Sequence, residues 1–186
     1  MNMHKELKFL FDEDQYECIN QPRDGTPEHF ALRKKCKVRI SKVKEIVELD
    51  KDLPGDDYFH AGIIFMHGDC PEDFWHAYTL FLKAAGQNYE GAKRFAAAAF
   101  DKWLIYQSKP QKFGLQYVPD GIRLRLWDVD PKTTDKERAD WDVPTLEQLN
   151  ENVKNLNETF DIEMIDMKNK PQWLKDAINR WNSRNN

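Results

Sequence analysis

Three helical segments joined by very short connections occupy the middle of the chain, and this feature limits the fold more than any other. The apolar pattern predicts helices over residues 57–67, 71–85 and about 90–107. Gly68 and Gly86 follow the first two, because glycine readily ends a helix. Connections this short make consecutive helices pack as neighbours that run in opposite directions. The sequence therefore predicts a group of antiparallel helices at the centre of the fold.

The segments on either side of this group are also mainly helical. Apolar residues recur at three- and four-residue spacing over residues 6–16, 27–49, 146–160 and 173–181. Thr134 and Glu137 have the spacing of a capping box. A chain of 186 residues, 40% hydrophobic and 32% charged, is long enough for one sizeable core. We expect a mainly α protein, a single domain over residues 1–186 of packed antiparallel helices with one small β-hairpin.

The hairpin is predicted by a change of period after the third central helix. Residues 115–118 and 122–126 flank the turn sequence Pro119-Asp120-Gly121, and the second segment alternates apolar and basic residues. Since alternate residues of a strand face opposite sides, the pattern places three side chains toward the core: Ile122, Leu124 and Leu126. Arg123 and Arg125 are then expected to face solvent or a polar pocket.

Charge and cysteine content narrow the function classes. The chain has 28 basic and 32 acidic residues, a net charge of −4, so we expect no nucleic-acid partner. Seven basic residues lie between positions 33 and 44, which is typical of a solvated helix face or of a phosphate-binding face. Cys18, Cys36 and Cys70 form no CxxC pair and indicate reduced thiols. Without a signal-peptide pattern or a membrane-length apolar run, a cytoplasmic protein that does not enter a membrane is expected.

Two histidines on the first central helix are candidates for acid/base chemistry. His60 and His67 are seven residues apart, so on a helix they lie on one stripe, one above the other. Such a pair is typical either of proton-transferring groups or of partly buried, hydrogen-bonded histidines. Asp69 completes a His-x-Asp pattern, but it also stands where the next helix needs a cap. His76 lies opposite the apolar stripe of its own helix, so we expect no metal site.

Asp101 stands in a stretch that is apolar all round its helix. Between Phe95 and Tyr106 the only polar residues are Asp101 and Lys102. A carboxylate in a buried helix needs a partner that supplies charge or hydrogen bonds. We expect His60 or His67 to be that partner, with Asp101 either orienting a general base or forming a structural ion pair.

The segment after this helix carries two amides, in Gln111 and Gln116, together with a glycine and an aromatic residue. Amides donate and accept hydrogen bonds without titrating, which suits the binding of a carbonyl group or an oxyanion. They are equally suited to satisfying the backbone of an irregular connection. The candidate site therefore comprises the helices over residues 57–108 and the loop over residues 109–117.

Three boxes in this region resemble a known family. They are His60-Ala61-x5-His67-Gly68-Asp69-x-Pro71-Glu72-Asp73, Ala97-Ala98-x2-Asp101-Lys102 and Pro110-Gln111-Lys112-Phe113-Gly114-x-Gln116. Together they resemble a group of bacterial and fungal domains of unknown function, and the likeness extends to residues 12–15 and 134–138. The chain departs from that pattern at Met66, where the family has glutamine, and at Leu115, where it has threonine. The resemblance implies candidate residues and no reaction.

A weaker likeness is to Sel1-type helical repeats, in which small residues allow close helix contact. The residues that carry it are Gly68-Asp69, Ala77, Lys83-Ala84-Ala85-Gly86 and Ala92. This likeness implies helix packing and a surface that binds another protein.

Two hypotheses follow for the function. The first is a metal-independent acid/base enzyme of the hydrolase, lyase or cyclase type, acting on a small polar molecule without a cofactor. Its predicted catalytic residues are His60, His67 and Asp101, and its predicted substrate-binding residues are Gln111, Gln116 and Lys102. The second is a non-catalytic module that presents a groove to a peptide or protein partner. Convergence of the polar residues on one concavity would favour the enzyme, and their dispersal would favour the module.

Overall fold

Helices make up most of the computed structural model, which describes residues 4–159 and 167–183. The helices are α1 (Lys5–Ile19), α2 (Pro27–Leu49), α3 (Gly55–Met66), α4 (Pro71–Gly86), α5 (Ala92–Ile105), α6 (Asp135–Asp140), α7 (Leu146–Thr159) and α8 (Gln172–Ser183). Two short strands, β1 (Tyr117–Pro119) and β2 (Leu124–Leu126), form an antiparallel pair. The predicted fold class, a packed helical domain with one small hairpin, is confirmed.

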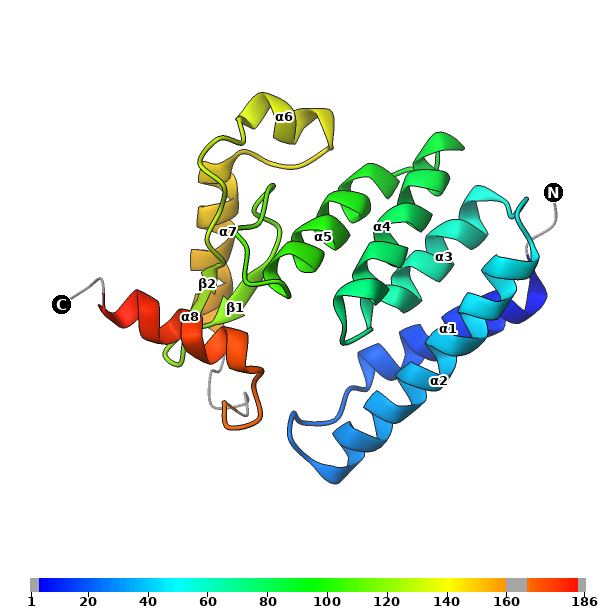
Figure 1. The fold of residues 1–186 in the computed structure, drawn as a ribbon, viewed down its shortest axis with the longest axis horizontal. Helices are drawn as coiled ribbons and strands as arrows, with labels where there is room; N and C mark the ends of the chain where they lie inside the picture. Colours follow the sequence, from blue (N-terminus) through cyan, green and yellow to red (C-terminus); the bar gives the residue numbers. More distant parts are fainter. Residues whose placement is uncertain (1–3, 160–166, 184–186) are drawn as a thin grey trace.

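The three central helices lie side by side, and α1 and α2 pack against α3 (Figure 1). Gly62 allows α3 to approach α4 closely, because a Cβ at this position would lie 2.6 Å from the Phe81 ring. Buried apolar side chains from all five N-terminal helices form one continuous core. These helices therefore hold the ends of α1 and α3 in fixed positions, which matters for the site described below.

The C-terminal elements gather around the far end of α5 (Figure 1). Trp127 and Trp181 pack together there, with their ring centroids 5.4 Å apart, in a second core that includes Ile105 of α5. Asn157 of α7 holds β2 in place through two hydrogen bonds to Leu124. Its side-chain oxygen accepts from the Leu124 N–H, and its side-chain NH₂ donates to the Leu124 carbonyl, both at 2.8 Å. A third core joins α5 to α7 and the loop after α5.

The hairpin forms, but its second strand begins at Leu124, two residues later than predicted. Ile122 is 81% exposed, so the expectation that it faces the core is wrong, whereas Leu124 is buried. The reason is that Asp120 accepts hydrogen bonds from the N–H groups of Ile122 and Arg123, which makes them part of the turn. Arg125 lies with its guanidinium 3.9 Å from the centre of the Trp181 ring.

The ends of the helices follow the sequence closely, with one correction. The capping box of Thr134 and Glu137 forms as predicted at the start of α6. Asp69, however, is not the cap of α4: the N-cap residue is Cys70, and the Asp69 carboxylate pairs with Lys37 at 2.9 Å. Position 160, expected on the apolar face of α7, lies outside the described residues. Within the described parts of the chain, no helix has the length and apolar character needed to cross a membrane.

Candidate functional site

His60 and His67 lie on the same side of the chain, as their spacing predicts, and both contact α1, but their surroundings differ. His60 is buried and stacks on the ring of Phe11, with the ring centroids 3.9 Å apart. Its Nδ1 atom has no hydrogen-bond partner among the described residues. Burial lowers the pKa of His60, and the negative charge of Asp57 offsets this only in part. At neutral pH His60 is therefore an uncharged core residue.

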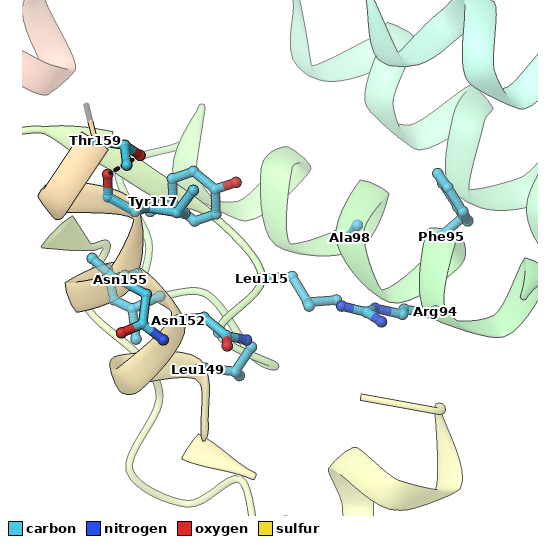
Figure 2. Close-up of a pocket in the computed structure, with 13 residues that line it drawn as sticks. Arg94, Phe95, Ala98, Leu115, Tyr117, Leu149, Asn152, Asn155 and Thr159 are labelled. Carbon is cyan, nitrogen blue, oxygen red and sulfur yellow. Dashed lines mark hydrogen bonds between the residues drawn. The ribbon is translucent and has the colours of Figure 1, made fainter. Parts of the chain in front are cut away.

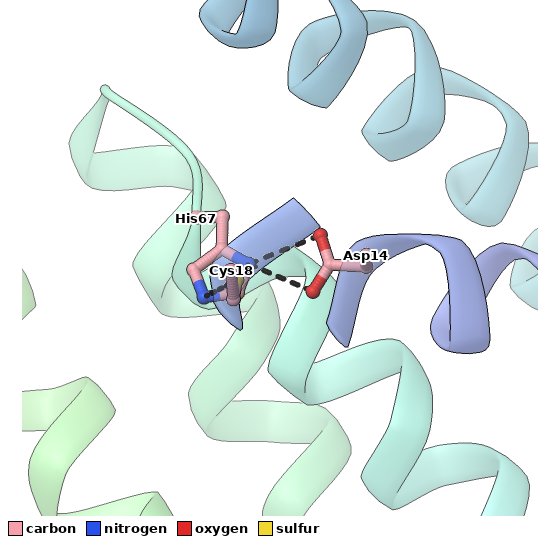
Figure 3. Close-up of side chains that lie close together, drawn as sticks. All are labelled: Asp14, Cys18 and His67. Atoms are coloured by element: carbon pink, nitrogen blue, oxygen red, sulfur yellow. Dashed lines mark hydrogen bonds and ion pairs between the residues drawn. The ribbon is translucent and has the colours of Figure 1, made fainter. Parts of the chain in front are cut away.

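His67 follows the last turn of α3 and contacts two side chains of α1 (Figure 3). Its Nδ1 atom lies 2.9 Å from Oδ2 of Asp14 and 3.1 Å from Oδ1. The sulfur of Cys18 lies 3.6 Å from Nε2 and 3.8 Å from Nδ1. The imidazole remains 31% exposed, whereas Asp14 is almost wholly buried. One side of the ring is thus held by a buried carboxylate while the ring itself is open to solvent.

Arg39 of α2 pairs with the Asp14 carboxylate and holds it in place. Its guanidinium donates to Oδ1 of Asp14 at 2.9 Å and to Glu17 at 2.6 Å. An ionised carboxylate only accepts hydrogen bonds, so Nδ1 of His67 must be the donor in this pair. The neutral ring then carries its lone pair on Nε2, which is the arrangement that a general base requires.

The same three residues offer ligand atoms to a metal ion. One atom each from Asp14, Cys18 and His67 lie within 4.8 Å of one another. Carboxylate, thiolate and imidazole are all zinc ligands. The Arg39 guanidinium, however, already neutralises Asp14, and a second cation beside it would be repelled. Desolvation of the sulfur and the charge of Asp14 raise the pKa of Cys18 to about 11, so in the absence of a metal ion it is a thiol at neutral pH. The surroundings fit a proton-transfer pair better than a metal site.

Asp101 is buried as predicted, but its partners are not histidines. Oδ1 accepts hydrogen bonds from the backbone N–H groups of residues 112 and 113 at 2.7 and 2.8 Å, and Oδ2 accepts from those of residues 114 and 115, both at 2.9 Å. Burial raises the pKa of Asp101 to about 6, against the opposing effect of these four bonds. The predicted pairing of Asp101 with His60 or His67 is wrong, and the predicted three-residue catalytic centre does not assemble.

The side chains of Gln111 and Gln116 form hydrogen bonds with backbone groups in and around the loop over residues 109–117. Gln111 is wholly buried, donates to the carbonyls of Gln116 and Trp127 at 2.9 Å, and accepts from the N–H of Gln116 at 2.8 Å. The side-chain amide of Gln116 donates to the carbonyl of Ala98 at 2.9 Å. The prediction of a substrate contact at Gln111 is therefore wrong: both amides satisfy the backbone of an irregular connection, which was the alternative.

Lys102 lines an open cavity of about 750 Å³ at the α3–α4 connection. Arg33 of α2, Tyr106 of α5 and Gly68 also line this space, which we term the Arg33–Lys102 cavity. Its wall includes the residue directly after His67 and, at Gln21, the chain shortly after Cys18. Asp14, Cys18 and His67 do not themselves line this cavity; its link to the Asp14–His67 pair runs through the backbone, because Arg33 donates to the carbonyls of His67 and Gly68.

An open, mainly apolar groove of about 730 Å³ lies elsewhere, between α5, the hairpin and α7 (Figure 2). Phe95 and Ala98 stand on one side, and Leu149, Asn152 and Asn155 stand on the other. Neither predicted histidine contributes to this groove. The predicted site residues are thus divided between the core, the Asp14–His67 pair, the loop and the Arg33–Lys102 cavity.

Comparison with known proteins adds no assignment to this geometry. No family model matches the chain, and no curated protein and no solved structure matches it. The candidate functional site therefore depends on the contacts of its own residues.

Proposed function

We propose that the protein is an acid/base enzyme in which His67 transfers the proton, acting on a small polar molecule without a metal. Asp14 takes the orienting role that the sequence suggested for Asp101. The observation that carries the proposal is the Asp14–His67 pair, in which a buried carboxylate holds Nδ1 of a partly exposed imidazole at 2.9 Å. The Arg33–Lys102 cavity, whose wall includes Gly68, the residue after His67, provides space for a substrate.

The chemistry follows from the fixed tautomer. Nε2 takes a proton from an attacking water, hydroxyl or thiol, and the imidazolium that forms is stabilised by the negative charge of Asp14. The proton then passes from Nε2 to the leaving group, so His67 returns to its neutral form. Arg39 contributes by holding Asp14 in position, since an unanchored carboxylate would not define the orientation of the ring.

Cys18 gives the proposed centre a neighbouring nucleophile. Its sulfur is almost equally distant from both ring nitrogens, and its thiol form requires a base to remove the proton during attack. The proposed centre therefore allows two reactions with an ester. His67 activates water directly, or Cys18 attacks the ester and the thioester that forms is then hydrolysed.

Hydrolysis of p-nitrophenyl acetate tests the proposal, because this ester needs only a base or a nucleophile. The wild-type protein should exceed free imidazole at equal concentration by about tenfold or more. His67→Gln should lose this excess, and His76→Gln, the control, should keep it. A wild-type rate no higher than that of imidazole, or an excess that survives in His67→Gln, would contradict the proposal.

Cys18→Ala then selects between the two reactions. An unchanged rate assigns the reaction to water activated by His67. A lost rate, together with an acetyl group on Cys18 in the mass spectrum of the wild-type protein, assigns it to the thiol.

The apolar groove favours a second candidate function, the binding of a peptide partner. Phe95 is 39% exposed and Leu156 is 38% exposed, and Arg94 supplies a cation at the same groove. These residues suit a peptide with apolar side chains and an acidic residue. Selection from a random peptide library tests this function: selected peptides should lose binding to Leu156→Glu and retain it with Tyr16→Glu, an exposed position on α1. Binding unaffected by Leu156→Glu would exclude the groove.

A further inference from the structure

Two cations line the Arg33–Lys102 cavity without an acidic partner among the described residues. Arg33 donates to the carbonyl oxygens of His67 and Gly68, at 2.8 and 3.3 Å. The Lys102 ammonium donates to the carbonyl oxygen of Met66 at 2.7 Å and lies 4.6 Å from the centre of the Phe74 ring. Among the described residues, the hydrogen bonds of both side chains go to uncharged groups, the carbonyls at the end of α3, and Lys102 also lies over an aromatic face.

The acidic residues of the cavity wall are already paired with other cations. Asp24 forms an ion pair with Lys170, and its Oδ1 lies 3.3 Å from Nδ1 of His29. Asp69 pairs with Lys37 at 2.9 Å. Neither carboxylate is thus available to neutralise Arg33 or Lys102, and the wall carries an excess of positive charge although the whole chain has a net charge of −4.

The two cations also affect one another. Burial lowers the pKa of Lys102 to about 8, and the positive charge of Arg33 adds to this effect. The carbonyls at the C-terminus of α3 carry a partial charge of about −0.5, which offsets only part of two full positive charges. An anion in the cavity would relieve both the repulsion and the cost of burial.

We propose that the Arg33–Lys102 cavity binds an anionic group, a carboxylate or a phosphoryl group. Arg33 has donors beyond the two that it uses, Lys102 has two further N–H bonds, and Tyr106 lines the same space. A planar guanidinium beside an ammonium is a combination that recognises such groups. The inference names the substrate class of the proposed enzyme, and in that respect it rests on the proposed function; anion binding itself needs no proton transfer by His67.

The probes are inorganic phosphate and acetate. Titration calorimetry measures the affinity of each for the full chain. Phosphate should bind wild type at least tenfold more tightly than it binds Lys102→Met or Arg33→Gln. Lys93→Met removes an exposed cation from the same helix and should bind as wild type does. Tighter binding of phosphate than of acetate would assign a phosphoryl group, and the reverse order would assign a carboxylate. Equal affinities in Lys102→Met and Lys93→Met, or no binding of either anion by wild type, would overturn the proposal.

Thermal unfolding separates anion binding from a purely structural role. If Lys102 only caps α3, Lys102→Met lowers the melting temperature and phosphate does not raise that of wild type, which would contradict the proposal. The proposal predicts that phosphate raises the melting temperature of wild type and not of Lys102→Met. Asp14→Leu should keep phosphate binding. Intact binding together with ester hydrolysis that is independent of His67 would therefore refute the proposed function and leave this inference standing.

Discussion

Asp14 and Asp101 are both wholly buried carboxylates on helices, yet their surroundings give them different roles. Asp14, on α1, is bonded by the side chains of Arg39 and His67. Asp101, on α5, is bonded by four consecutive backbone N–H groups. The first carboxylate is linked to a partly exposed imidazole, whereas the second is enclosed by the loop that it organises. Burial of a charged residue therefore indicates an important contact without indicating whether that contact serves chemistry or architecture.

The two carboxylates differ in whether a group bonded to them stays accessible to a substrate. The four N–H groups around Asp101 are fixed parts of the backbone and leave no titrating partner exposed to a substrate. The imidazole of His67 keeps one nitrogen free of the Asp14 pair, and the ring is 31% exposed. Each prediction below alters one side of this comparison.

The largest effect is expected at Asp101. Asp101→Leu leaves four backbone N–H groups without their acceptor, two of them in buried residues, and each buried loss costs about 1–3 kcal/mol, so the free energy of unfolding should fall by about 4 kcal/mol or more. Urea denaturation measures it. Asp101→Asn retains the shape but brings an NH₂ group toward N–H donors, and a loss above about 2 kcal/mol is expected. A loss below about 1 kcal/mol for Asp101→Leu would show that the loop does not depend on this carboxylate.

The next largest effect on the free energy of unfolding is expected at Arg39. Arg39→Met leaves the Asp14 carboxylate buried without its cation, which should lower the free energy of unfolding by about 3 kcal/mol. The control is Lys35→Met: Lys35 pairs with Glu17 at the surface, and its loss should cost less than about 1 kcal/mol. Equal losses in the two variants would mean that the Arg39–Asp14 pair contributes no more than a surface ion pair.

Gly114 tests whether the loop around Asp101 depends on its backbone conformation. The residue has a φ of +96°, and a Cβ there would lie 3.1 Å from Leu149. Gly114→Ala should therefore lower the free energy of unfolding by about 1–3 kcal/mol. Gly86→Ala, at the end of α4 with no atom within 4 Å of the added Cβ, should change it by no more than about 1 kcal/mol. Similar values for both variants would argue against a strained loop.

Lys102, the neighbour of Asp101, extends the comparison to a cation. Because its folded pKa of about 8 lies below the ordinary lysine value of 10.5, the folded state binds fewer protons than the unfolded state between these pH values. Stability linked to this group therefore rises as pH increases from about 8 to 10.5 and is lost as pH falls through 8. The difference in melting temperature between wild type and Lys102→Met should follow this trend in buffers without phosphate. A difference that is constant with pH would contradict a desolvated ammonium.

The sequence predicted the fold well because the helices are marked by local signals. Gly68, Pro71 and the Thr134–Glu137 capping box mark helix ends through the chemistry of neighbouring residues alone. Asp101 was correctly predicted to be buried, but its donors are backbone groups of a loop, which no side-chain pattern reveals.

Asp14 was missed for a different reason. It stands in the acidic sequence Asp12-Glu13-Asp14, which is typical of a solvated surface. A signal was nevertheless present: Leu7, Leu10 and Asp14 lie on one helical stripe, and all three are buried. An acidic residue that continues an apolar stripe needs a partner, and His67 and Arg39 lie far from it in sequence.

The tautomer of His67 tests the central claim most directly. Long-range ¹H–¹⁵N correlation spectra at a pH where the ring is neutral distinguish a proton on Nδ1 from one on Nε2. We predict the Nδ1–H form in wild type and in Cys18→Ala, a shift toward Nε2–H in Asp14→Leu, and no change in Asp101→Asn at a temperature where it is folded. An Nε2–H form in wild type, or a tautomer that responds to Asp101 and not to Asp14, would contradict the account.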